Sequence, residues 1–211
     1  MDHASDVLDY WFGKRESDSE SLTERMAFWF PADGNSEIVA LRDREIAARF
    51  EPLMQRAQDG QLDAWADSPR RRLALILLFD QFPRNVHRGS ARAFATDERA
   101  LALTLAGMQG AADAALQPLE RVFFYMPLQH SESLAVQEES LAAYRRLFDE
   151  TSGALQRVAA NTLKYAQLHH ELIRRFDRFP HRNALLGRQS TAEEQALLDE
   201  EGMDFGQRPR A

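Results

Sequence analysis

Candidate acid–base and anion-binding residues occur in a phrase that the sequence uses twice. Residues 80–85 read Asp-Gln-Phe-Pro-Arg-Asn, and residues 177–183 read Asp-Arg-Phe-Pro-His-Arg-Asn. Each copy follows an apolar segment, so charged and hydrogen-bonding side chains stand at what we expect to be the edge of a core. Buried polar groups need hydrogen-bond partners. Here the partners are either one another or a ligand.

Arginine gathers around both copies of the phrase. Residues 69–92 contain six Arg and one acid, and residues 174–188 contain five Arg and one acid. The guanidinium fork suits carboxylate and phosphate oxygens and stays charged when buried. We therefore expect a site for a small anionic molecule or an acidic peptide, with Asp80 and Asp177 orienting the guanidinium groups. The candidate binding residues are Asp80, Arg84, Asn85, Arg88, Tyr125, His169, Asp177, Arg182, Asn183 and Arg188.

Histidine offers a second kind of chemistry in the same segments. A histidine titrates near neutral pH and can therefore move protons. The candidate catalytic residues are His130, Glu132 and His181, with Glu132 or an Asp adjusting the pKa of His130. In this alternative the protein is an enzyme of hydrolase or lyase type, and the arginines hold its small anionic substrate.

A third interpretation is that the polar residues only join helix corners. A buried Asp at a helix end commonly accepts backbone N–H groups and an arginine fork, and Ser131 and Glu132 suit a helix N-terminus. The alternatives predict different structures. An enzyme predicts a closed pocket with His130 or His181 beside a carboxylate, whereas a peptide-binding module predicts an open apolar groove. The corner interpretation predicts that every arginine is paired and that there is no cavity.

We expect no cofactor and no metal from the sequence motifs. There is no cysteine, and His170-Glu171 is followed by Arg174 where a zinc protease has its second histidine. The sequence contains no Glu-x-x-His, P-loop, Gly-x-Gly-x-x-Gly or Gly-x-Ser-x-Gly. The open route to a metal site is a set assembled in space from His130, His169 and carboxylates.

Composition limits the partners. The net charge of −7 argues against a general nucleic-acid-binding protein, which needs a basic face. No apolar run approaches the roughly 20 residues that span a bilayer, and the first residues lack the pattern of a signal peptide. We therefore expect a cytoplasmic protein with neither a nucleic-acid nor a membrane partner. A homodimer is compatible with the sequence.

The chain reads as helical nearly throughout. Ala, Leu, Glu, Gln and Arg dominate, and no segment alternates with period two. We expect residues 1–200 to form a single all-α domain of roughly nine helices stacked as antiparallel hairpins, followed by a frayed tail at 201–211. The expected helices lie at about residues 6–12, 22–30, 36–58, 69–79, 96–105, 118–126, 133–148, 154–176 and 191–200.

One segment is expected to lie at the centre of the domain. Residues 73–79 are apolar on every face of a helix, which predicts burial on every side. The following residue, Asp80, is therefore the one we expect to be most shielded from water. Because the phrase occurs twice after helices, pseudo-symmetry predicts that its two corners lie near each other.

Four segments together resemble a known family. They are residues 8–13 (Leu-Asp-Tyr-Trp-Phe-Gly), 78–85 (Leu-Phe-Asp-Gln-Phe-Pro-Arg-Asn), 125–132 (Tyr-Met-Pro-Leu-Gln-His-Ser-Glu) and 175–183 (Arg-Phe-Asp-Arg-Phe-Pro-His-Arg-Asn). The chain resembles, over roughly residues 5–200, the bacterial family numbered 924 among domains of unknown function. That resemblance implies a tetratricopeptide-like all-α fold and implies no reaction. The sequence departs from the family at Phe79, where Leu is more usual, and at Asp177, where Gly is more usual.

Overall fold

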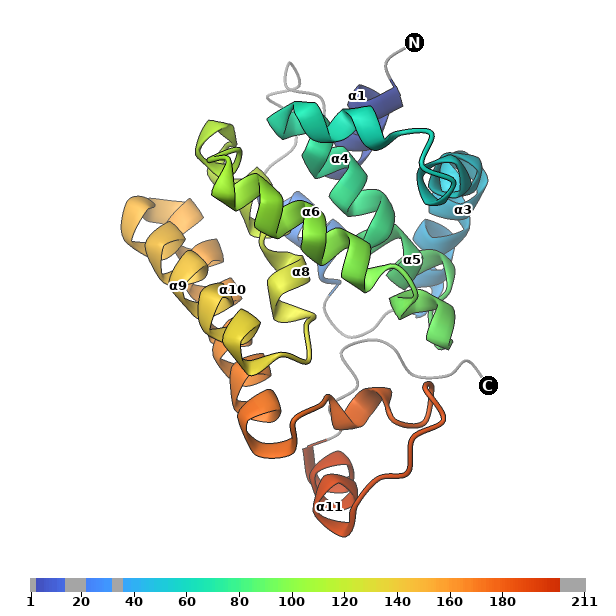
Figure 1. The fold of residues 1–211 in the computed structure, drawn as a ribbon, viewed down its shortest axis with the longest axis vertical. Helices are drawn as coiled ribbons and strands as arrows, with labels where there is room; N and C mark the ends of the chain where they lie inside the picture. The colour runs from blue at the N-terminus through green and yellow to red at the C-terminus, as the bar shows by residue number, and fades with distance from the viewer. Residues whose placement is uncertain (1–2, 14–21, 32–35, 202–211) are drawn as a thin grey trace.

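The computed structural model describes residues 3–13, 22–31 and 36–201, and these residues form helices joined by turns (Figure 1). Within these ranges nine α-helices have seven or more residues, two are shorter, and there is no strand. The all-α prediction is therefore confirmed. The α-helices are α1 His3–Phe12, α2 Leu22–Trp29, α3 Ser36–Gln58, α4 Pro69–Phe79, α5 Gln81–Val86, α6 Asp97–Gln109, α7 Pro118–Phe124, α8 Met126–Gln129, α9 Leu134–Glu150, α10 Gly153–Phe176 and α11 Ala192–Glu201. Short 3-10 helices are η2 Asp63–Asp67, η3 Ala91–Phe94, η4 Asp113–Ala115 and η5 Pro180–Arg182.

Helix α4 is the centre of the fold. Each residue from Leu73 to Phe79 is at most 1% exposed, and α4 contacts α1, α3, α6 and α7. Ser68 has an extended conformation and Pro69 takes the first helical position, where its missing N–H costs nothing. The helix ends at Asp80, which is 0% exposed, as the apolar run predicted.

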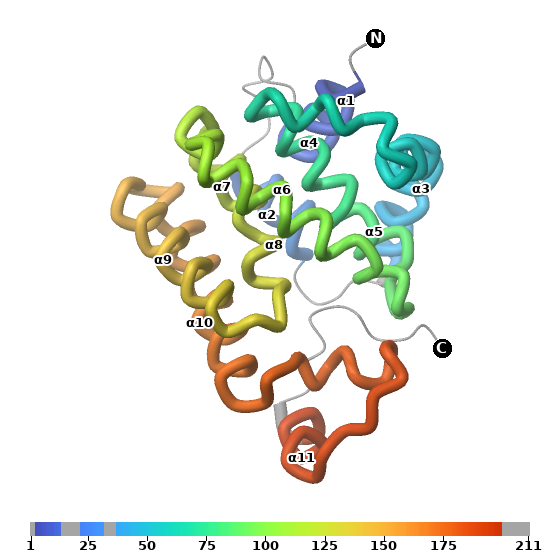
Figure 2. The backbone as a smooth tube through the Cα atoms, viewed as in Figure 1, coloured from blue at the N-terminus to red at the C-terminus, as the bar shows by residue number. Residues whose placement is uncertain are grey.

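Helices α9 and α10 form an antiparallel hairpin along one side of the molecule, shown together in Figures 1 and 2. Gly153 joins them with φ of 59°, a left-handed conformation that glycine adopts without strain. Helix α10 is amphipathic, with Val158, Thr162 and Ala166 among its buried residues. The hairpin contacts α7 and α8, and α6 and α7 in turn contact α4.

The first two helices are held by aromatic packing. The Trp29 indole donates a hydrogen bond of 2.9 Å to the Trp11 carbonyl, and both indoles pack edge-on against Phe123 of α7. Aromatic pairs of this geometry add to the burial energy. Trp11 and Trp29 lie in the core, whereas Phe30 is 45% exposed.

The C-terminal part has a small core of its own. Leu172, Ile173, Phe179 and Leu197 form a buried cluster separate from the main one. Helix α11 begins with the capping box expected from the sequence, because the Thr191 hydroxyl and the Glu194 carboxylate accept each other's backbone N–H. From residue 202 onward the expected frayed tail lies outside the described residues. The single domain and the tetratricopeptide-like arrangement stay predictions.

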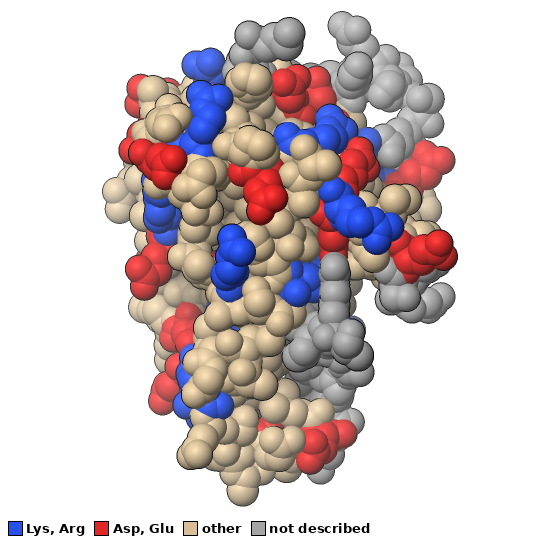
Figure 3. All heavy atoms as spheres, turned by 90° about the vertical axis from the view of Figure 1, so that its right-hand side faces the viewer, with Lys and Arg blue, Asp and Glu red and all other residues tan. Residues whose placement is uncertain are grey.

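The surface mixes both signs of charge. On the face shown in Figure 3, basic and acidic side chains alternate across the helices rather than gathering into one field. None of the helices described is long and apolar enough to cross a membrane.

Candidate functional site

A largely buried polar contact joins the end of α4 to the turn after α8. His130 Nδ1 lies 2.6 Å from Asp80 Oδ1, and Asp80 Oδ2 accepts from Gln81 Nε2 at 2.5 Å. Arg84 Nη1 forms an ion pair with Asp80 Oδ1 at 3.1 Å and donates to the Asp80 backbone carbonyl at 2.9 Å. The sequence predicted that Glu132 or an Asp would adjust His130, and the structure places Asp80 there. Because α4 is surrounded by apolar helices, it positions this carboxylate rigidly in the core.

Arg84 continues the chain of contacts to α6 and η5. Its guanidinium forms a two-pronged pair with Asp97, at 2.7 and 2.8 Å. Asp97 Oδ2 also lies 3.4 Å from Arg182 Nη1. The two corners of the repeated phrase therefore lie near each other, as pseudo-symmetry predicted. Their arginines share one carboxylate.

Aromatic rings connect the two ends of this series of contacts, Arg182 and His130. The Arg182 guanidinium carbon lies 4.5 Å from the Phe179 ring centre, and Phe179 lies 5.3 Å from the ring of His169. The His169 ring lies 6.4 Å from that of His130. These contacts close a ring of residues, which we call the contact ring. Its members are His130, Asp80, Arg84, Asp97, Arg182, Phe179 and His169.

The formal charges of the contact ring balance when its histidines are neutral. Asp80 and Asp97 offset Arg84 and Arg182. Burial alone raises the pKa of Asp80, but Arg84 and His130 outweigh it, so this pKa lies below its usual range. Asp80 is therefore a carboxylate at neutral pH.

Burial and neighbouring positive charge keep the histidines neutral. Burial and Arg84 lower the pKa of His130, although Asp80 opposes them. Burial and the positive charge that His130 would carry lower the pKa of His169 to about 3. His181, beside Phe179, has a pKa lowered to about 2 by burial and by Arg182. All three imidazoles therefore offer neutral nitrogens at pH 7.

Arg182 is the least compensated cation of the contact ring. It is 6% exposed, and its Nε is buried with no hydrogen-bond partner among the described residues. Its contact with a carboxylate is the 3.4 Å contact to Asp97, whose two oxygens already hold Arg84. Burial and the charge of Arg84 lower the pKa of Arg182 to about 10. The faces of Phe94 and Phe179, at 4.6 and 4.5 Å, supply part of the missing stabilisation.

Two predicted binding residues belong to a different network. Arg88 forms a two-pronged pair with Asp43 of α3, at 2.8 and 3.0 Å. Asn85 accepts from Arg88 and donates to the Gln81 carbonyl at 2.7 Å. These contacts fasten α5 to α3, as the corner interpretation predicted.

A third network holds the second corner. Glu132 accepts from Arg188 at 2.7 and 2.9 Å and from the backbone N–H of Phe179 at 2.8 Å. Asn183 accepts from Arg188 and donates to Glu194. Burial raises the pKa of Glu132, but its bonds to Arg188 and Phe179 bring it below the usual value. Glu132 therefore anchors the loop through Arg188 and Phe179.

Tyr125 belongs to a fourth network. Its hydroxyl donates to Asp113 at 2.6 Å and accepts from Arg121 at 3.3 Å. Burial and the hydrogen bond to Asp113 raise the pKa of Tyr125. These bonds tie α7 to η4 and use the hydroxyl that we had expected to face a ligand.

The expected role of Asp177 is wrong. Its side chain is exposed, and the residue ends α10 in a left-handed conformation with φ of 55°. The carboxylate that orients Arg182 is Asp97 instead. Asp97 went unnoticed in the sequence because an acid after Thr96 reads as an ordinary first-turn residue of a helix. Phe94 and Phe179 were missed as well, since aromatic residues beside Pro and Arg read as core.

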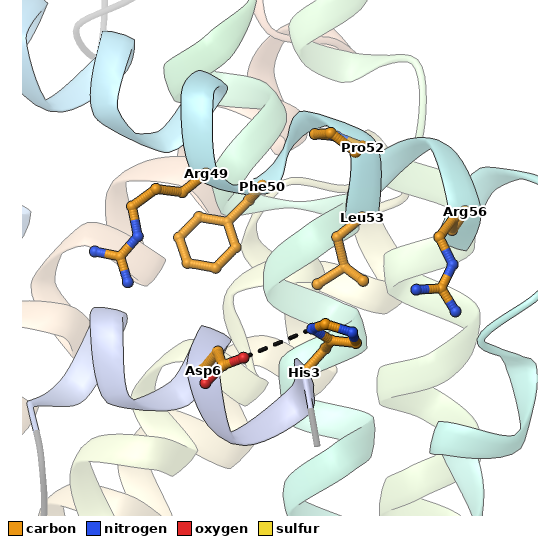
Figure 4. Close-up of a pocket in the computed structure, with 7 residues that line it drawn as sticks. All are labelled: His3, Asp6, Arg49, Phe50, Pro52, Leu53 and Arg56. Atoms are coloured by element: carbon orange, nitrogen blue, oxygen red, sulfur yellow. Dashed lines mark ion pairs between the residues drawn. The ribbon is translucent and has the colours of Figure 1, made fainter. Parts of the chain in front are cut away.

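The rest of the described chain offers weaker candidates for a binding site. Within the described ranges, no three His, Asp or Glu side chains are arranged to hold a metal ion. A hollow of about 320 Å³ lies between α1 and α3 (Figure 4). Arg49, which lines it, already pairs with Glu45 at 3.1 Å, and both side chains are 48% exposed. Water therefore screens the charges of this hollow, and it makes a weaker candidate than the contact ring.

Comparison with known proteins identifies a family and points to no particular reaction. The family model described as "Bacterial protein of unknown function (DUF924)" matches residues 7–202. A solved structure, that of the protein of unknown function ATU0120 from Agrobacterium tumefaciens, is 33% identical in sequence. The similarity covers 94% of this chain and 97% of that one, with a TM-score of 0.75. Curated proteins give no match.

Proposed function

Since the chain belongs to the DUF924 family, whose function is unknown, we propose a function from its own geometry: it binds a small anionic molecule at the contact ring, beside Arg182. The other candidate arginines are accounted for by carboxylates. Arg84 pairs with Asp97, Arg88 with Asp43 and Arg188 with Glu132, each through two hydrogen bonds. The corner interpretation explains these three arginines and leaves Arg182.

The observation that carries the proposal is the incomplete pairing of Arg182. A guanidinium has five N–H donors. Arg182 makes one long contact with a shared carboxylate, and its Nε is buried with no partner among the described residues. A buried donor without a partner costs free energy. An oxyanion that accepted from Arg182 would remove that cost.

The burial of Arg182 favours a small anion over an acidic peptide. Its side chain is only 7% exposed, so a ligand must reach it with a narrow group. A peptide-binding module is expected to present an open apolar groove. The hollow between α1 and α3 is lined instead by His3, Asp6, Arg49 and Arg56 together with three apolar residues.

Acid–base chemistry on the bound anion is the second candidate. It is favoured by the 2.6 Å contact between His130 and Asp80, which holds the imidazole at one nitrogen. A carboxylate that orients a histidine is a common arrangement in enzymes that move protons. The same contact also suits a buried corner, so it supports this function less specifically than Arg182 supports anion binding.

The proposal is tested by calorimetric titration with inorganic phosphate, sulfate and acetate. Arg182→Met keeps most of the side-chain volume and removes the charge, and we expect it to weaken binding at least about tenfold. The control is Arg174→Met, because Arg174 lies on the surface and pairs with Glu171 of the same helix. The control should bind as the parent protein does.

Equal affinity of the parent and Arg182→Met for every anion would contradict the proposal. So would the absence of any anion binding to the parent. A synthetic acidic peptide that binds while the small anions do not would favour the peptide alternative instead.

A further inference from the structure

The bonding of Asp80 determines which nitrogen of His130 carries the proton. Gln81 Nε2 is an obligatory donor and bonds the carboxylate of Asp80, and the Arg84 guanidinium forms an ion pair with the same carboxylate. Asp80 is therefore an acceptor with its charge retained. The third partner, His130 Nδ1 at 2.6 Å, must then be a donor, because two acceptors at that distance would repel each other.

A neutral imidazole with its proton on Nδ1 has a lone pair on Nε2. Burial and Arg84 keep His130 neutral at pH 7. Its Nε2 is therefore a hydrogen-bond acceptor and cannot donate. Within the described part of the chain, no donor bonds this nitrogen, and the His130 side chain is 15% exposed. The nitrogen is thus an acceptor at the edge of the core.

Two series of contacts within the contact ring connect this acceptor to the Arg182 donor. Along one side, His130 reaches Arg182 through Asp80, Arg84 and Asp97. Along the other side, the rings of His169 and Phe179 join the same two ends. A ligand that bonds both ends needs an anionic oxygen for Arg182 and a hydrogen for His130.

We propose that the ligand of the contact ring is a small oxyanion that itself carries a hydroxyl or ammonium donor, with Arg182 bonding its anionic oxygen and His130 Nε2 accepting from its donor. This inference rests on the proposed anion-binding function and names the chemical class of the ligand. Hydroxy- and aminocarboxylates belong to the class, and so does phosphate that retains a proton. Fully deprotonated oxyanions such as sulfate do not.

Matched pairs of anions test the donor requirement. At about pH 6 phosphate is mostly the protonated monoanion, whereas sulfate has the same shape and no proton to donate. Lactate and propionate differ by one hydroxyl. We expect the parent protein to bind phosphate more tightly than sulfate, and lactate more tightly than propionate, by about tenfold in each pair, because a lone pair facing an acceptor loses its hydrogen bond.

Variants assign the preference to the histidine. His130→Phe removes the acceptor, so phosphate should bind no better than sulfate while the affinity for sulfate stays the same. His170→Phe is the control, since His170 is the neighbouring histidine of α10 and should leave both preferences intact. Should His130→Phe fail to fold, nitrogen NMR of the parent protein decides: Nε2 of His130 must show the shift of a ring nitrogen without hydrogen.

The outcomes separate this inference from the function on which it rests. Equal affinity within both pairs, or a proton found on Nε2, overturns the donor requirement and leaves anion binding standing. A preference that persists in His130→Phe overturns the role of His130. Failure of all four anions to bind overturns the proposed function and this inference with it.

Discussion

The two copies of the Asp-x-Phe-Pro phrase have opposite environments. At the first corner Asp80 is 0% exposed, bonds His130 and Gln81, and forms an ion pair with Arg84. At the second corner Asp177 is exposed and left-handed. The difference arises from the preceding helices, since α4 is buried on every side whereas α10 has one buried face. The same short phrase is therefore a buried polar junction in one place and a helix end in the other.

The arginines of the two corners differ in the same sense. Arg84 has Asp80 and both oxygens of Asp97, whereas Arg182 has one longer contact with Asp97 and the faces of two aromatic rings. The first corner is electrostatically complete. The second contains Arg182, which has a single long contact with a carboxylate, together with His169 and His181 as neutral neighbours. This contrast separates a stabilising junction from a candidate binding site.

Acid should destabilise the second corner through its two buried histidines. The folded-state pKa values of His169 and His181 are lowered to about 3 and about 2. Below about pH 6.5 the unfolded chain binds protons that the folded chain does not, so stability falls as the pH falls. Each histidine contributes about 1.4 kcal/mol per pH unit, or about 4 kcal/mol for both between about pH 7 and pH 5. Urea unfolding at a series of pH values measures this loss.

His169→Asn should remove about half of that acid sensitivity, and His170→Asn should leave it unchanged. The carboxylate of Asp80 adds nothing in this interval. Its folded-state pKa is lowered, so its stabilisation is present above the unfolded value of about 4 and is lost only at lower pH. A free energy of unfolding that is flat between about pH 7 and pH 5 would contradict the neutral burial of His169 and His181.

Removing the charge of each Asp tests the contrast between the corners directly. Asp80→Asn should lower the free energy of unfolding by about 3 kcal/mol, because Arg84 and His130 lose a buried anionic acceptor. Asp177→Asn should change it by no more than about 0.5 kcal/mol, since the residue is exposed and Asn tolerates the left-handed conformation. Chemical denaturation of both variants gives the values. Similar losses in the two variants would show that the corners are alike.

Replacing Arg84 should lower the free energy of unfolding more than replacing Arg182 does. The difference should be smaller than that between the two Asp variants. Arg84→Met is expected to cost about 2 kcal/mol, since Asp80 and Asp97 both lose a partner. Arg182→Met should cost less than about 1 kcal/mol, because Asp97 keeps Arg84 and the Met side chain packs against Phe94 and Phe179. Thermal and urea unfolding without added anion measure both. A larger loss in Arg182→Met would mean that Arg182 is a structural partner of Asp97, which weakens the binding proposal.

The smallest effect is expected at the end of α10. Asp177→Gly should raise the free energy of unfolding by about 0.5 kcal/mol, because glycine adopts a φ of 55° without the strain of a side chain. Asp177→Ala keeps that strain and should give no gain. High-precision urea unfolding of the two variants makes the comparison. Stabilisation by alanine equal to that by glycine would exclude backbone strain as the cause.

Local patterns in the sequence were sufficient for the nine longer helices and for one part of the site, but they did not predict α5 or α8. Ser68-Pro69 predicted the start of α4, Thr191 and Glu194 predicted the cap of α11, and the apolar residues 73–79 predicted both the central helix and the burial of Asp80. These features depend on neighbours a few residues apart, which a single sequence displays. The prediction for Asp177 was wrong because the phrase itself does not show how deeply its helix is buried.

Long-range partners were decided only by the tertiary structure. Asp97, which pairs with Arg84, meets Arg182 across 85 residues of sequence, and Asp43 meets Arg88 across 45. Nothing in the order of residues distinguishes these acids from others in first turns and on helix faces, because ion pairs between distant segments depend on how the helices pack. By itself the sequence determined which residues form helices and which polar group lies deepest. The packing of those helices decided which charges are compensated, and so left Arg182 and His130 as the groups to which a ligand is proposed to bind.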